Sequence, residues 1–409
     1  MSKQLLLVLS TIVAGFLHAA PLETSYLFEG YAIGSYHKVR NSLLNPANRS
    51  LQIPTYQAVL DLRPQAAADW ASLSALARPR IRGFAQSGDN LNEKTFARFH
   101  FDEASLKWNA TDNFQLLGGI HYVQWGPAEL FSPSNPLIHF SLDQRSIIFR
   151  MRGKALIKAD YYFSQKSFIT AIVEPLSNGE PDWITGYKFV PRGLVRWENQ
   201  IGDHPGNYFG LTAGRIEREN FFAAAYAAYY FDDFWSVYAD ARVSPGSPAL
   251  YPSLTSPTGF EPGQTNAGEW YSLSTFGVRW EGFFDTRLEY ILNTYGFAQS
   301  EWNSGFTLAA ANPGAGSALF RAGLEMPRHH YLYTSLRTDR LGTGDELRLS
   351  VRYLHSLVDH SGALFSAVEW NFNPVCTLIV EPMVTHGGAQ GEFSQAASAE
   401  IFTELRVAL

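Results

Sequence analysis

Hydrophobic and polar residues alternate one by one over long stretches of this chain. In the segment FWSVYADARV, residues 234–243, the odd-numbered positions carry Trp, Val, Ala, Ala and Val, and polar or aromatic residues fill most of the positions between. The same alternation recurs in residues 150–160, 287–293 and 346–354. A period of two over about eight residues is typical of a β-strand with one apolar and one polar face. The pattern therefore predicts an all-β protein.

The connections between the predicted strands are of two kinds. Tight turns are expected at residues 109–113, 163–167, 230–234, 281–285 and 371–375. Long loops rich in Gly, Pro, Ser and Asn are expected near residues 39–53, 125–144, 175–188, 244–270 and 387–396. One segment, Gln65 to Ala77, looks locally helical. We expect about 18 strands, in a range of roughly 16 to 20.

The first 20 residues differ in composition from the rest. Lys3 precedes an apolar run from Leu5 to Leu17, and small residues stand just before Pro21. Such a segment is typical of a secretory signal peptide and is too short to cross a bilayer as a helix. A buried N-terminal helix is the alternative. We expect a cleaved signal peptide over residues 1–20 and one domain over residues 21–409. Because Cys376 is the single cysteine of the sequence, no disulfide within the chain can stabilise this domain.

The apolar faces of so many strands need an apolar environment. A β-sandwich suits domains of about 100 residues, and no linker divides this chain into several such domains. In a bilayer every backbone polar group must be paired internally, so a sheet closes into a barrel with its apolar face toward lipid. The charged fraction of 17% is low against a typical value of about 25%. We therefore predict a single antiparallel transmembrane β-barrel with a polar lumen.

The predicted signal peptide, alternating strands, tight turns and C-terminal strand IFTELRVAL together resemble bacterial outer-membrane β-barrels of the porin or export-channel kind. The resemblance covers residues 24–409. It implies a place in the outer membrane of a Gram-negative bacterium, contact with outer-membrane lipid and insertion by the barrel-insertion machinery. Such proteins usually end in an aromatic residue, and Leu409 departs from that pattern. The segment WGPAELFSPSNPL also resembles the Trp-Gly and Asn-Pro loop of some large barrels that pass specific solutes.

That segment, residues 125–137, is the first candidate site. Three prolines fix the backbone and donate no hydrogen bond, so the segment cannot continue a strand ladder. It carries more apolar residues than a loop in water needs. Either it folds into the barrel mouth and narrows the pore, or it caps the rim and packs on its neighbours. The candidate constriction residues are Trp125, Pro127, Phe131, Pro133, Asn135 and Pro136.

Basic residues on the predicted polar faces form the second candidate site. Residues 78–158 hold 11 Lys and Arg against 7 Asp and Glu, in a chain of net charge −6. Cations around a pore favour anionic solutes. Alternatively, these residues pair with lumen carboxylates such as Asp102, Glu103, Asp160, Asp240 or Glu289 and brace the wall. The candidate pore-lining residues are Arg78, Arg80, Arg82, Arg98, Arg150, Arg152, Lys154 and Lys158.

The predicted function is an outer-membrane channel for passive passage of small or extended hydrophilic solutes, with a preference for anions. One alternative is a non-conducting barrel that binds a surface polysaccharide through loop aromatics such as Tyr251, Phe260 and Trp270. Another is an outer-membrane hydrolase. However, no G-x-S-x-G motif occurs, and adjacent residues such as Asp359, His360 and Ser361 point in different directions, so we expect no enzyme. No cofactor or metal motif appears, and the acidic balance disfavours nucleic acid.

Overall fold

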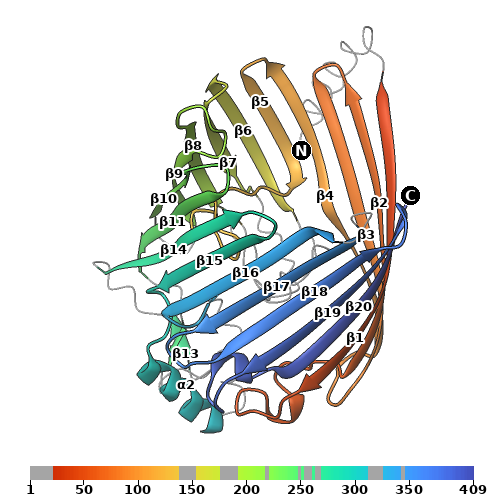
Figure 1. The fold of residues 1–409 in the computed structure, drawn as a ribbon, viewed down its shortest axis with the longest axis vertical. Helices are drawn as coiled ribbons and strands as arrows, with labels where there is room; N and C mark the ends of the chain where they lie inside the picture. The colour runs from red at the N-terminus through yellow and green to blue at the C-terminus, as the bar shows by residue number, and fades with distance from the viewer. Residues whose placement is uncertain are drawn as a thin grey trace, which may run out of the picture.

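A closed antiparallel sheet makes up most of the protein (Figure 1). The computed structural model describes residues 22–137, 153–175, 192–216, 221–246, 250–252, 260–262, 269–311, 326–341 and 346–409. Its sheet has 18 strands. β1 (Glu23–Val39) pairs with β2 (Tyr56–Trp70) on one side and with β20 (Ala397–Ala408) on the other, which closes the ring. The prediction of a single antiparallel barrel of about 18 strands is confirmed.

Each barrel strand pairs with its neighbours in sequence, and β11 pairs with β14 across a long connection. The strands of the first half are β3 (Leu73–Ser87), β4 (Thr95–Thr111), β5 (Phe114–His121), β6 (Lys154–Ser164), β7 (Ser167–Val173), β8 (Arg192–Gln200), β9 (Tyr208–Ile216) and β10 (Phe221–Tyr230). Those of the second half are β11 (Trp235–Pro245), β14 (Trp270–Glu281), β15 (Asp285–Asn293), β16 (His330–Leu341), β17 (Leu347–Ser356), β18 (Gly362–Asn371) and β19 (Cys376–His386).

Short connections gather at the end of the barrel where β1 begins and β20 ends. All five predicted tight turns join consecutive strands there and are confirmed. The opposite end holds the longer connections, which carry the hairpin β12 (Leu250–Pro252) and β13 (Phe260–Pro262), the helix α2 (Gln299–Ala311), and the 3-10 turns η1 (Pro46–Asn48) and η2 (Glu392–Ser394) (Figure 1). Within the described residues, none of the helices is long and apolar enough to cross a membrane. The predicted signal peptide, residues 138–144 and residues 176–188 lie outside the described part.

The helical interpretation of residues 65–77 is wrong. This segment forms the end of β2, a tight turn through Ala71 at φ 47°, and the beginning of β3. Across the turn Ala66 pairs with Ala77 and Trp70 with Leu73. The many alanines suggest a helix, but helix propensity is a weak prior that pairing with neighbouring strands overrides. Small alanines are also nearly neutral in hydropathy, so they hide the alternation of the two faces.

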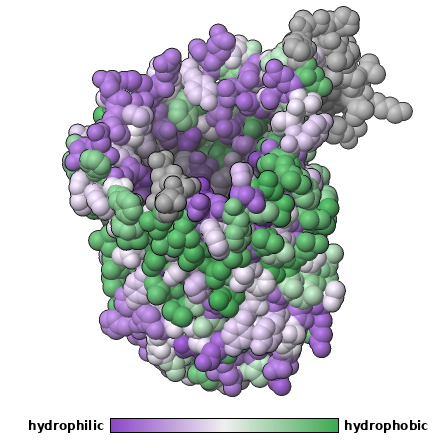
Figure 2. Space-filling model, turned by 45° about the vertical axis from the view of Figure 1, so that its right-hand side comes forward, coloured by the Kyte–Doolittle hydropathy of each residue, from purple (hydrophilic) through white to green (hydrophobic). Residues whose placement is uncertain are grey.

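The two faces of the strands separate as the alternation predicts. On β11, Trp235 is 47% exposed on the outside, whereas Ser236 and Asp240 are buried on the inside. Large apolar side chains such as those of Leu60, Phe99 and Phe276 stand exposed on the outer surface. Figure 2 shows a hydrophobic band around the middle of one side, with hydrophilic rims above and below it and a hollow with largely hydrophilic walls in its upper part. Exposed apolar surface of this extent is expected where a barrel meets lipid.

Candidate functional site in the barrel lumen

The segment that follows β5 reaches across the inside of the barrel. The backbone N of Ser134 donates to Oδ1 of Asp240 at 2.7 Å, and the backbone N of Glu129 donates to Oε1 of Glu289 at 2.6 Å. Asp240 on β11 and Glu289 on β15 are both buried and face inward. Strands β6 to β10 lie between β5 and β11 in the ring. The described part of the loop, residues 122–137, is therefore anchored on the opposite wall.

Hydrogen bonds within the loop give it a compact shape. The Trp125 indole Nε1 donates to the Ser134 carbonyl at 3.1 Å, and the Ser132 hydroxyl donates to the Trp125 carbonyl at 3.0 Å. The Ser132 hydroxyl also bonds Asp240, as does the Ser134 hydroxyl. Gly126 has φ +87°, and a Cβ at this position would overlap Ser132 and Asp240. The Trp-Gly pair noted in the sequence thus lets the loop fold closely onto Asp240.

The apolar residues of the loop pack inside the barrel rather than at its outer surface. Phe131 lies in a buried cluster with Ile291, Tyr333 and other inward-facing residues of β15 to β19. Trp125 and Leu137 lie in a second cluster formed with inward-facing residues of β5 to β10. Of the candidate constriction residues, Pro127 is half-buried and the rest are buried: Trp125, Phe131, Pro133, Asn135 and Pro136. The loop thus fills space between two sides of the wall.

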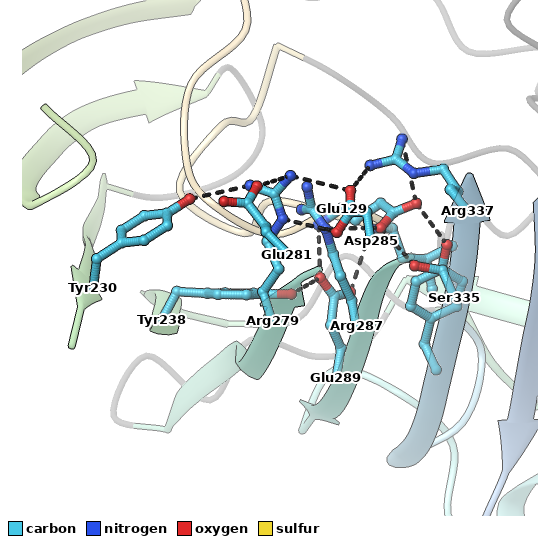
Figure 3. A network of polar contacts seen from close by, with 12 residues as sticks. Glu129, Tyr230, Tyr238, Arg279, Glu281, Asp285, Arg287, Glu289, Ser335 and Arg337 are labelled. Atoms are coloured by element: carbon cyan, nitrogen blue, oxygen red, sulfur yellow. Dashed lines mark hydrogen bonds and ion pairs between the residues drawn. The ribbon is translucent and has the colours of Figure 1, made fainter. Parts of the chain in front are cut away.

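Three arginines face the loop from neighbouring strands (Figure 3). Arg279 Nε lies 2.9 Å from Asp285 Oδ1, and Arg337 Nη2 lies 2.5 Å from Asp285 Oδ2. Arg287 Nε lies 3.1 Å from Oε2 of Glu129, which belongs to the loop. We call Arg279, Arg287 and Arg337 the arginine cluster. Its members share the carboxylates of Glu129 and Asp285 across β14, β15 and β16.

The register of the sheet explains how the arginine cluster forms. Arg279 pairs directly with Arg287 across the tight turn that joins β14 and β15, and Asp285 pairs with Arg337 on β16. All three point to the lumen because they share the inward face with buried residues such as Glu289. Arg337 keeps 39% of its side chain exposed, against 23% for Arg279 and 13% for Arg287. Arg337 is therefore the member that a solute in the lumen reaches most easily.

Several of the basic residues predicted to line the pore are held in ion pairs on the wall. Arg80 is 1% exposed, and its Nη2 lies 2.5 Å from Asp61 Oδ2. Arg78 pairs with Glu103 and donates from Nε to Gln65 Oε1 at 2.7 Å. The role of these residues as a pore lining stays a prediction.

The remaining predicted lining residues differ in exposure. Arg82 and Lys154 are buried, and Lys158 Nζ lies 2.8 Å from Asp160 Oδ2. Arg98 is exposed, with its guanidinium carbon 4.9 Å from the centre of the Phe96 ring. Arg150 and Arg152 lie outside the described residues. Among the predicted lining residues that the structure describes, Arg98 has the greatest access to water.

The sequence pattern does not single out the arginine cluster. Arg287 falls on a predicted polar face, but nothing in the sequence pattern identifies Arg279 or Arg337 as facing the lumen. The tight turn at residues 281–285 is a usable signal, because a turn fixes the register and so places residue 279 opposite residue 287. Arg337 follows a long connection after β15, so its partner on β15 cannot be obtained in this way.

A closed barrel with an apolar outer band, a polar lumen, and tight turns gathered at one end with longer loops at the other is the architecture of bacterial outer-membrane porins. The chain has this fold, as the sequence pattern predicts. OccAB1 of Acinetobacter baumannii is similar in structure, with a TM-score of 0.57 at 8% sequence identity over 95% of this chain and 96% of that one.

Two Pseudomonas aeruginosa structures are also similar. OpdK with vanillate has a TM-score of 0.51 at 10% identity, and OccK2 in complex with glucuronate has a TM-score of 0.51 at 12% identity. Each comparison covers 95% of this chain and 98% of the other. No family model matches the sequence, and no curated protein matches it either. At such low identity the similarity establishes the fold.

Proposed function

We propose that this protein is an outer-membrane channel for the passive passage of small hydrophilic solutes that carry a carboxylate. The observation that carries the proposal is the arginine cluster, which stands in the lumen directly against the inward-folded loop (Figure 3). A guanidinium remains charged at any physiological pH and presents paired donors that match the two oxygens of a carboxylate. The vanillate and glucuronate in two of the similar structures are both carboxylates.

The carboxylates around the arginine cluster should let a solute pass through the lumen instead of holding it there. Asp285 and Glu129 already occupy part of the donors of Arg279, Arg287 and Arg337. A solute carboxylate therefore replaces existing partners instead of meeting bare cations, and conduction requires binding weak enough for the solute to leave. In this proposal the loop of residues 125–137 forms the constriction on the opposite side of the path.

We assign different roles to the basic residues on β3, β4 and β6. Arg98 is exposed and attracts anions in the lumen. Arg78, Arg80 and Lys158 brace the wall, because each is bound to a carboxylate of its own or a neighbouring strand. Removal of Arg98 should then change ion selectivity, whereas removal of Arg80 should chiefly lower stability.

Ion selectivity in planar bilayers tests the proposed function. One unit charge at about 8 Å in water contributes about 0.5 kcal/mol, with opposite signs for an anion and a cation, so Arg337→Gln should lower the ratio of anion to cation permeability about fivefold. Asp285→Asn removes a negative charge from the same place and should raise the ratio by a similar factor. Lys166→Gln, in an exposed turn beside Asp203, serves as the matched control. Unchanged ratios in both lumen variants would reject the arginine cluster as the selectivity element.

The same recordings separate the two alternative functions. A purified barrel that passes no steady current would favour the non-conducting barrel that binds polysaccharide. For a hydrolase, the Ser361 hydroxyl would need a histidine, but it donates directly to Asp359 Oδ1 at 2.6 Å, and the His360 ring lies 6.2 Å from the His355 ring. The contacts of Asp359 with Ser361 and Arg328 favour a structural role for Asp359 and Ser361.

A further inference from the structure

Four ring side chains cluster on the outer surface of the barrel at the long-loop end. The His355 ring lies 5.8 Å from the His386 ring and 6.2 Å from the His360 ring, measured between centres. The Tyr353 hydroxyl lies between two of them, 3.1 Å from His355 Nδ1 and 2.8 Å from His386 Nε2. We call Tyr353, His355, His360 and His386 the histidine cluster.

The histidine cluster faces away from the lumen. Tyr353 and His355 share the outer face of β17 with the exposed Val351, and His386 shares the outer face of β19 with the exposed Val384. On β18, Gly362 pairs with both His355 and His386. A Cβ on Gly362 would lie 2.7 Å from His386 Nε2 and 3.1 Å from the Tyr353 hydroxyl, so the bare backbone makes room for the rings.

The position along the strands places the cluster at the border of the apolar band nearest the long loops. Exposed aliphatic residues lie next to it on the membrane side, on β17, β18 and β19: Val351, Leu364 and Val384. On the long-loop side the strands β17 and β18 are joined by only five residues, 357–361, so no long connection between these two strands covers the rings. In an outer-membrane barrel the long loops face outward from the cell. The cluster is therefore level with the headgroups of the outer leaflet.

The charges around the cluster are those that attract an anion. Lys38 on the outer face of β1 is exposed, two strands from β19, and Arg40 donates from Nη2 to the Thr385 carbonyl at 3.4 Å. His330 on the outer face of β16 stacks on Tyr290 at 6.1 Å. The carboxylate of Asp359, in the turn beside the cluster, lies 3.0 Å from Arg328 Nη2. Glu400 is buried on the inner face of β20.

We propose that the histidine cluster, together with Lys38, binds a phosphate group of lipopolysaccharide in the outer leaflet. Imidazole and phenol groups supply hydrogen-bond donors at the height where the lipid phosphates lie, and Lys38 supplies a permanent charge. Phosphate oxygens are strong acceptors for such charge-assisted bonds. A metal ion is a poorer fit, because within the described part of the chain no group of three or more His, Cys, Asp or Glu could hold one. The proposal depends on the outer-membrane location and is independent of channel activity.

Binding should depend on pH with a definite sign. Imidazole ordinarily titrates near pH 6.5, and a phosphate stabilises its charged form, so affinity should rise as pH falls from 8 to 6. Other titratable or charged groups on this side of the barrel include Tyr353, Lys38 and Arg40. Asp359 remains bound to Arg328 inside. A phosphate monoester, whose second pKa is about 6, loses part of its charge over the same range. The difference in pH dependence between the wild type and the histidine variants therefore reports the histidines.

The experiment measures lipopolysaccharide binding to the full-length mature protein in detergent with EDTA present, by native mass spectrometry and fluorescent-lipid titration. Two exposed charge pairs contribute up to about 1 kcal/mol each, so the double variant His355→Gln with His386→Gln should bind about tenfold more weakly at pH 6 and only slightly more weakly at pH 8. Lys38→Gln should weaken binding at both pH values. His204→Gln, in a turn at the opposite end of the barrel, is the matched control.

Three results would overturn the proposal. The first is equal affinity of the wild type and the double variant at pH 6, with unchanged heat-modified mobility in electrophoresis showing that both are folded. The second is equal binding of dephosphorylated lipopolysaccharide. The third is full displacement of the lipid by inorganic phosphate at the same concentration, which would assign the cluster to the free ion rather than to the lipid.

Discussion

Asp240 should hold the lumen loop in place, and its removal gives the most direct test of the structure. The carboxylate lies buried beneath the loop and accepts three hydrogen bonds from it. These come from the Ser134 backbone N at 2.7 Å, from the Ser134 hydroxyl at 3.0 Å and from the Ser132 hydroxyl. In Asp240→Ala both Ser134 donors lose this acceptor, and the Ser132 hydroxyl keeps the Trp125 carbonyl. The second part of the loop should then leave the wall, while Glu289 still binds the backbone of Glu129.

The size of the effect follows from these contacts. Each hydrogen bond to a charged acceptor contributes about 1.5–3 kcal/mol, and water in the lumen replaces part of what is lost. We therefore expect a net loss of about 3 kcal/mol in the docking of the loop, or about a 150-fold change in the ratio of docked to undocked states. Asp240→Asn should have a smaller effect, because the amide oxygen can still accept from Ser134 and its nitrogen can donate to a hydroxyl.

Single-channel recording measures the outcome. Asp240→Ala should show a larger mean conductance and more current noise in the open state than the wild type, because a docked loop narrows the lumen. Gly126→Ala should act in the same direction, since a Cβ there would overlap Ser132 and Asp240. Asp203→Ala, in an exposed turn, serves as the control. If Asp240→Ala and Gly126→Ala both keep the conductance and noise of the wild type, the loop does not set the width of the pore.

Two further predictions concern stability and pH. Arg80→Ala breaks buried ion pairs with Asp61 and Asp102 and should lower the free energy of unfolding by about 3 kcal/mol. Urea unfolding in micelles measures this loss, with Arg98→Ala at an exposed position as the reference. An equal loss of stability in the two variants would contradict the bracing role of Arg80. Burial, together with the charge of Asp359, raises the pKa of Glu392 in the outer loop to about 8. The stability that protonated Glu392 contributes to the folded loop is therefore fully present below a pH of about 4.5 and is lost as pH rises through about 8. Hydrogen exchange around η2, corrected for the intrinsic rate, should therefore increase between pH 7 and 9 in the wild type but not in Glu392→Gln, and an equal increase in both would exclude Glu392 as the cause.

The barrel could be predicted from the sequence because its cause is local. The alternation on β11 shows which side chains face lipid and which face the lumen, and the tight turns show where the chain reverses between strands. The two elements that the sequence analysis predicted wrongly or missed also have local causes. Alanines in residues 65–77 carry little contrast between the two faces, and α2 has no strong amphipathic pattern to reveal it, since its residues Gln299–Ala311 mix small and polar types.

The lumen loop could be predicted only in part. Its prolines and apolar residues show that it leaves the sheet and needs a packing surface, but nothing in them selects Asp240 or Glu289 as the anchor. Those carboxylates lie more than 100 residues away in sequence, at separations of 106 and 160 residues from Ser134 and Glu129. They meet the loop only because the closed ring brings β11 and β15 opposite β5. Contacts across the lumen are therefore set by ring closure, which no local pattern encodes.

The same reasoning explains why a local excess of positive charge is a poor guide to the solute path. The window of residues 78–158 is basic by count, yet Asp61 lies outside it on β2, pairs in register with Arg82 and binds Arg80. An arginine becomes available to a solute only where its neighbours in register leave part of it exposed, as they do for Arg337. Register, rather than the count of charges along the chain, thus decides which cations face the solute, and the contrast between Arg80→Ala and Arg337→Gln measures that difference.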